Sequence, residues 1–223
     1  MPAARWLGEG ESHAKMLRTA QALYGLDAVT IGGGGFLGAE ACRSAAAPSL
    51  GAVAARAAAQ SRNRLATLPD PESVAGGFTV ALARDVIRRL RPVLGERAGI
   101  VVVLPSPSLL AAELGRGDDE EWAAAVVAAV LRTIGPEEPD AVLLLGDDDS
   151  IDPTLETLGE FYGAPVLATG RASPAGLLAL SMADLLGTAS PAAAWIYTSA
   201  EEIPADADPQ ALRAAINRLR ARG

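Results

Sequence analysis

The chain has 223 residues and a formal net charge of −8, and half of its residues are hydrophobic. These values predict a single domain, residues 1–223, with a sizeable core. The acidic balance argues against nucleic acid and anionic membranes as partners. One cysteine, Cys42, and one histidine, His13, exclude an intrachain disulfide and a zinc site built from Cys and His ligands.

No targeting or membrane segment is evident. Residues 1–10 have no apolar core of the kind that signal peptides carry. No apolar run approaches the roughly 20 residues that cross a bilayer. We therefore expect a soluble, cytoplasmic protein whose partner is a small molecule. A homodimer is compatible with the sequence, which does not determine the oligomeric state.

Helical and strand patterns alternate along the chain. In chain order, they predict a helix at Glu11–Tyr24, a strand at Asp27–Ile31, a helix from Leu37, helical residues 41–69, a helix at Pro71–Leu94, a strand at Gly99–Leu104, helices at Leu109–Leu114 and Glu121–Ile134, a strand at Asp140–Leu145, a helix at Pro153–Tyr162, strands at Ala164–Thr169 and Ala193–Thr198, and a helix at Asp208–Arg222. Leu177–Leu185 fits neither pattern clearly. Ser12 and Ser108 are predicted as helix caps.

The predicted strands are apolar throughout and are separated by helices. This pattern is typical of a parallel sheet that is covered on both faces. The number of strands fits either an open doubly wound sheet or a reduced (β/α) barrel.

Three stretches resemble the uroporphyrinogen decarboxylase superfamily. The first is Leu26-Asp27-Ala28-Val29-Thr30 with Ala39-Glu40-Ala41, the second runs from Leu68 to Pro107, and the third runs from Pro139 to Asp152 and includes Ile203-Pro204. The superfamily includes the heme-pathway decarboxylase, the corrinoid methyltransferases and the cobalamin-independent methionine synthases. The resemblance implies a reduced or incomplete (β/α) TIM-type barrel with mostly parallel strands, and a lyase or transferase activity.

The chain departs from this family where the family's chemistry is located. It has no counterpart of the N-terminal arginine segment that holds substrate carboxylates, and the family's aspartate falls among Gly33–Gly35. The late zinc-binding cysteine of the methyltransferases would lie near Ser199–Glu201, where no Cys or His occurs. We therefore expect neither decarboxylation of uroporphyrinogen nor bound zinc.

The densest group of candidate catalytic residues follows the strand Asp140–Leu145. It consists of Asp147, Asp148, Asp149 and Asp152. Active sites of barrels and open parallel sheets lie at such strand ends. Asp148, Asp149 and Asp152 also have the D-D-x-x-D spacing of terpene synthases, whose carboxylates bind Mg²⁺. The alternative interpretation is a solvated acidic loop.

Four further residues are candidate substrate ligands. Gly34 lies in Gly33–Gly38, which matches G-x-G-x-x-G, a turn that can bind an anion. NAD(P) is not expected there, because residues 41–69 contain no acid to hold a ribose. Ser106, Arg171 and Tyr197 each follow or end a predicted strand. The simpler interpretations of Ser106 and Arg171 are a turn residue and an exposed arginine.

Three functional hypotheses follow. The first is an enzyme of the uroporphyrinogen decarboxylase-like group that acts on a small organic acid or activated metabolite. It would use the carboxylates for acid–base or electrostatic catalysis and Arg171 for an anionic group. The second is a Mg²⁺-dependent enzyme of prenyl diphosphates. The third is a binding or scaffold protein without catalytic activity.

Overall fold

A parallel sheet forms the centre of the computed structural model, which describes residues 9–32, 68–146, 150–169, 177–180, 196–199 and 208–220. Its strands are β1 (Ala28–Gly32), β2 (Gly99–Pro105), β3 (Ala141–Leu145) and β4 (Val166–Ala168), in the spatial order β1-β2-β3-β4. Every pair in this sheet is parallel. The prediction of an α/β fold with a parallel sheet is confirmed.

A second, two-stranded parallel sheet consists of β5 (Leu177–Leu180) and β6 (Ile196–Ser199). β5 lies within Leu177–Leu185, the segment whose sequence pattern fitted neither a helix nor a strand clearly. The described helices are α2 (Gly10–Tyr24), α5 (Pro71–Ala75), α6 (Phe78–Leu94), α7 (Pro107–Glu113), α8 (Glu120–Ile134), α9 (Pro153–Tyr162) and α11 (Pro209–Arg220), with short 3-10 turns η1 (Gly95–Arg97) and η2 (Gly135–Glu137).

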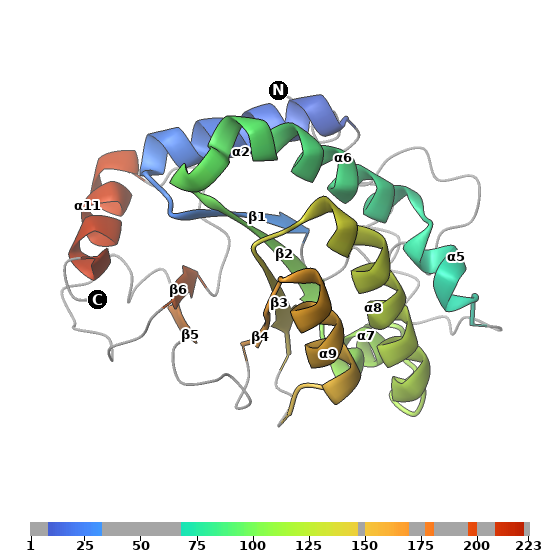
Figure 1. Ribbon diagram of the computed structural model, residues 1–223. Coiled ribbons are helices and arrows are strands. Elements are labelled where there is room, and N and C mark those ends of the chain that lie inside the picture. Colours follow the sequence, from blue (N-terminus) through green and yellow to red (C-terminus); the bar gives the residue numbers. More distant parts are fainter. Residues whose placement is uncertain are drawn as a thin grey trace.

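Helices α2, α6, α8 and α9 pack against the same face of the four-stranded sheet (Figure 1). In parallel register, side chains at the same level point to the same face, and Ile31, Val102 and Val142 share one level. All three belong to the core that these helices complete. Because the four strands follow one another in sequence order and these helices share a face, the described part of the chain winds in a single direction.

The opposite face of the sheet is also apolar and covered. Val103 and Leu143 are paired in register on this face and are only 8% and 5% exposed. At the β1 edge the same face carries Thr30, which is exposed. The absence of alternating polar residues in β3 is explained by this burial on both sides.

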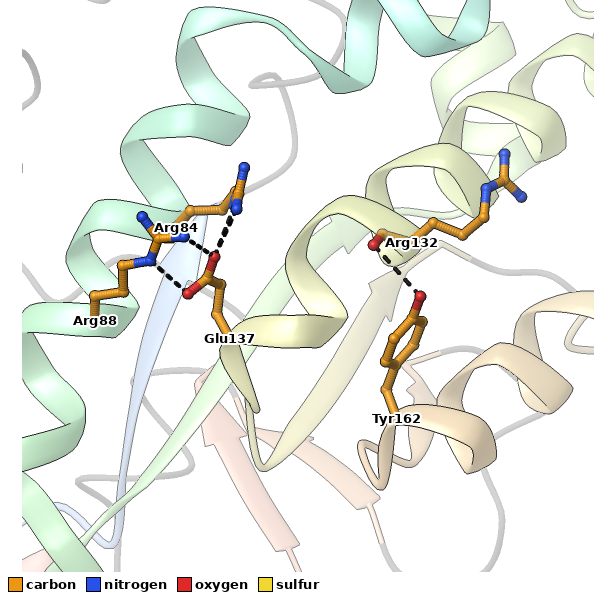
Figure 2. Close-up of polar contacts among 5 residues, drawn as sticks. All are labelled: Arg84, Arg88, Arg132, Glu137 and Tyr162. Atoms are coloured by element: carbon orange, nitrogen blue, oxygen red, sulfur yellow. Dashed lines mark hydrogen bonds and ion pairs between the residues drawn. The ribbon is translucent and has the colours of Figure 1, made fainter.

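α11, the last helix, packs against α2, the first described one (Figure 1). At the other side, Tyr162 of α9 lies against Gly135, where a Cβ would overlap its ring, and its hydroxyl donates to the carbonyl of Arg132 at 3.5 Å (Figure 2).

In the part of the chain that the structure describes, no helix is both long and apolar enough to cross a membrane.

Three local predictions were wrong. The segment Pro71–Leu94 forms two helices, because Gly76 and Gly77 interrupt it. Ser12 lies inside α2, where its hydroxyl donates to the carboxylate of Glu9. The N-cap of α7 is Ser106 and not Ser108, since Pro107, with its fixed φ, begins the helix two residues earlier than the apolar pattern indicated.

Candidate functional site

A pocket of about 520 Å³ lies at the carboxyl ends of β2, β3 and β4. It is bounded by the amino-terminal ends of α7, α8 and α9, and its lining residues are Ser106, Pro107, Glu120, Glu121, Ala124, Leu144, Gly146, Ser150, Ile151, Asp152, Pro153 and Ala168. This is the edge of a parallel sheet at which binding sites form. Its volume is in the range of small-molecule pockets.

Ser106 lines this pocket, as expected for a candidate ligand, and it also has a structural role. Its side chain accepts a hydrogen bond from the backbone N–H of Leu109 at 3.3 Å and therefore caps α7. The hydroxyls of Ser106 and Ser108 are 3.2 Å apart. With 2% of its surface exposed, Ser106 is one of the few polar residues buried in the described part of the chain.

Asp152 is the one member of the predicted aspartate group that the structure describes, and it lines the pocket. Its carboxylate accepts a hydrogen bond from the N–H of Thr154 at 2.7 Å, which makes it the N-cap of α9. A negative charge is favourable at this end of a helix. Asp152 therefore combines a structural contact with a position on the pocket wall.

Two acidic residues that sequence reasoning did not single out also line the pocket. Glu120 and Glu121 form the first turn of α8 and bring two more carboxylates to the same space as Asp152. The sequence pattern placed Glu121 at the start of a predicted helix, and neither residue was selected as a ligand. Their place in the first turn of a helix was the available signal, because acids are enriched there.

The charged side chains among the described lining residues are all acidic: Glu120, Glu121 and Asp152. Within the described ranges, however, no three Asp, Glu, His or Cys side chains are close enough together to hold a metal ion. The described lining can therefore attract a cationic group or a metal ion, but it does not by itself form a complete metal site.

A hydrogen-bonded cluster holds the strand ends under the pocket. The N–H of Ser106 donates to the carbonyl of Leu145 at 2.7 Å, which ties the end of β2 to β3. Thr169, directly after β4, donates its N–H to the carbonyl of Leu144 at 3.0 Å and accepts the N–H of Gly146 on its hydroxyl at 3.2 Å. Sequence reasoning did not select Thr169.

The other predicted site residues cannot be placed in the pocket. Asp147, Asp148, Asp149, Gly34 and Arg171 lie outside the described residues. For Tyr197 the structure describes its position in β6, where it pairs with Leu178, but not its side chain. The roles assigned to these residues stay predictions.

His13 lies away from this pocket, in a second and smaller cavity. This space of about 40 Å³ lies between α2, α6, α8 and the first two strands, and its walls are mostly apolar. His13 and Thr79 are its buried polar residues. Burial lowers the pKa of His13 below 6.5, because desolvation disfavours the charged imidazolium.

Neither models of known protein families nor curated protein sequences match this chain. The pocket and its lining residues are therefore the basis for assigning a function.

Proposed function

We propose that the chain is a small-molecule enzyme, a divergent member of the uroporphyrinogen decarboxylase-like group, and that its substrate occupies the pocket at the carboxyl ends of β2–β4. The single direction of winding supports this proposal. Four consecutive parallel strands whose described helices share one face resemble a (β/α)-barrel wall, whereas open doubly wound sheets have helices on both faces. In barrels, the carboxyl ends of the strands carry the active site.

The pocket's lining limits how a substrate would be bound. Three carboxylates repel a free anion, so the part of the substrate near Glu120, Glu121 and Asp152 would be neutral or cationic. A carboxylate or phosphate on the same molecule would lie toward Arg171, which follows Thr169 by two residues in the sequence. The carboxylates would act as general acids or bases, or would stabilise developing positive charge.

A blocked pocket tests this assignment. Ala124 lines the pocket from α8, while its neighbour Ala125 is exposed and does not line it. Ala124→Trp should therefore fill the pocket, and Ala125→Trp is the matched control. Saturation-transfer NMR with mixtures of carboxylic, keto and phosphorylated organic acids would be recorded for all three proteins.

We expect compounds that bind wild-type protein and Ala125→Trp but not Ala124→Trp. Turnover of such a compound, followed by NMR, would then identify the reaction. If binding is equal in all three proteins, the ligand occupies another site. If no compound binds, the enzyme proposal loses its support and the scaffold hypothesis gains.

A second candidate is a Mg²⁺-dependent enzyme of prenyl diphosphates. It is favoured by the position of Asp152, the last residue of the D-D-x-x-D pattern, on the wall of a pocket with two further carboxylates. Calorimetric titration of farnesyl diphosphate with and without Mg²⁺ tests it. The candidate requires binding that depends on Mg²⁺ and is lost in Asp152→Asn; Mg²⁺-independent binding or no binding would exclude it.

A further inference from the structure

We propose that Thr169 is a positioning residue for the pocket. It fixes the backbone of Gly146, the residue at which the chain leaves β3. This inference rests on the proposed function in one respect: the proposed function assigns a ligand to the pocket. Thr169 is not among the residues that line the pocket, whereas Gly146 and Ala168 are. Its effect on a ligand would therefore pass through the backbone of its neighbours.

The hydroxyl of Thr169 lies at the centre of the strand ends. It accepts the N–H of Gly146 at 3.2 Å, and it is within donating distance of two carbonyl oxygens, those of Gly146 at 3.3 Å and Leu144 at 3.4 Å. The side chain that follows β4 thus reaches backbone groups on both sides of the last residue of β3, and its one hydroxyl proton serves one of the two carbonyls at a time. A backbone group near the sheet that lost this partner would have to shift toward water.

Gly146 has a backbone conformation and surroundings that favour glycine. Its φ is +152°, a value that side-chain-bearing residues rarely adopt, and a Cβ at this position would overlap Ser106 Oγ. Ser106 thus occupies the space that a side chain of residue 146 would need. Gly146, which follows β3, therefore lies between Ser106, which follows β2, and Thr169, which follows β4.

The position of Gly146 in the chain gives this cluster its importance. Gly146 lines the pocket, and so do Ser150 and Asp152, which follow it by four and six residues in the sequence. The backbone geometry of Gly146 therefore sets the direction in which the chain leaves β3. Binding groups must be held within about 0.5 Å of their working geometry by such supporting contacts.

Thr169→Val removes the hydroxyl and keeps the shape of the side chain, and Thr169→Ser, which keeps the hydroxyl, is the matched control. Thr169 is half-buried, so water can replace its hydrogen bonds and we expect Thr169→Val to fold. Amide hydrogen exchange and ¹⁵N relaxation dispersion would be measured by NMR. Should Thr169→Val not fold, Thr169→Ala would take its place.

We expect exchange at the amide of Gly146 to be about 10-fold faster in Thr169→Val, as the loss of one hydrogen bond predicts, and nearly unchanged in Thr169→Ser. The amides of Ser150 and Asp152 should show new microsecond-to-millisecond motion. The amide of Val142, which bonds to the carbonyl of Pro165 at 3.0 Å deeper in the sheet, should not change.

Two outcomes would overturn the inference. If the amides of Ser150 and Asp152 show no new microsecond-to-millisecond motion in Thr169→Val, Thr169 supports only its own strand. If the amide of Val142 exchanges faster by the same factor, its role is general stability. None of these measurements needs a ligand. The proposed function fails if no compound is found whose binding Ala124→Trp abolishes, and that result is independent of the exchange and relaxation measurements on Thr169→Val.

Discussion

Glu137, in the turn that precedes β3, accepts a hydrogen bond from Arg88 of α6 at 2.6 Å (Figure 2). Arg84, one helical turn earlier, donates to the same carboxylate at 2.9 Å. The side chain of Glu137 is only 8% exposed, whereas that of Arg88 is 59% exposed. This contact joins α6 to the amino-terminal end of β3, the end of the sheet opposite the candidate site.

Glu137→Ala should lower the free energy of unfolding by about 2 kcal/mol, because charge-assisted hydrogen bonds to a buried carboxylate are lost. Chemical denaturation at pH 7 measures this loss. Glu96→Ala is the control: Glu96 is exposed in the equivalent turn before β2, and its loss should cost less than about 0.5 kcal/mol.

The hydrogen bond from Arg88 and its charge hold the pKa of Glu137 below 4.5. The folded state therefore binds fewer protons than the unfolded state between the two pKa values, so this contribution is present above pH 4.5 and is lost as pH falls through the folded pKa. The stability difference between wild type and Glu137→Gln should narrow below pH 4.5. A constant difference from pH 7 to pH 3 would contradict this explanation.

His13 predicts a second pH effect, in a different range. Its pKa is lowered below 6.5 by burial, so in the window below pH 6.5 the unfolded chain binds a proton that the folded chain does not. The free energy of unfolding should therefore fall as pH falls from 6.5. Denaturation curves of wild type and His13→Gln between pH 7.5 and 5 test this, and the slope should be smaller in the variant. Parallel slopes would refute the assignment to His13.

Glu113, the last residue of α7, should destabilise the protein at neutral pH. Its carboxyl is half-buried, burial raises its pKa above 4.5, and none of the described residues donates a hydrogen bond to its Oε2. The folded state thus binds more protons than the unfolded state between the two pKa values, so stability falls as pH rises through this window. Glu113→Gln should stabilise by about 1 kcal/mol at pH 7 and by much less at pH 4. Equal effects at both pH values would show that charge is not the cause.

Asp152 offers a test that separates folding from binding. Asn caps helices about as well as Asp, so Asp152→Asn should change the free energy of unfolding by less than about 0.5 kcal/mol, whereas Asp152→Ala should cost about 1 kcal/mol. Both variants remove the carboxylate from the pocket wall. Thermal unfolding and binding of a ligand identified for the wild type would be measured together. A ligand that binds Asp152→Asn as tightly as the wild type does not use this carboxylate.

The sequence predicted most elements because their signals are local. Apolar runs such as residues 141–145 and the Pro-initiated helix Pro153–Tyr162 were predicted within one residue of where the structure has them. The wrong predictions involved competition between nearby signals, as at Ser106 and Ser108, where two serines were available to cap one helix. Because α7 begins at Pro107, the residue at its N-cap position is Ser106.

The site was only partly predictable. Ser106 and Asp152 were selected because each follows a predicted strand, and both line the pocket. Glu120, Glu121 and Thr169 were missed: the first turn of α8 marks Glu120 and Glu121 as helix-start residues, but no local pattern shows that they or Thr169 lie at the edge of the sheet that carries the pocket. Glu121 is 31 residues from Asp152 in sequence, and only the packing of α8 beside α9 brings both to one pocket.

The sequence by itself determined the class of fold, the apolar character of the strands and the acidic balance of the chain, since composition and periodicity carry these properties. Tertiary structure decided the direction of winding, the shared helical face and the assembly of the pocket. These depend on contacts between residues far apart in the chain, such as the hydroxyl of Thr169 on the N–H of Gly146, 23 residues earlier. Local patterns cannot encode such contacts, because the same residues would form the same strand in either winding.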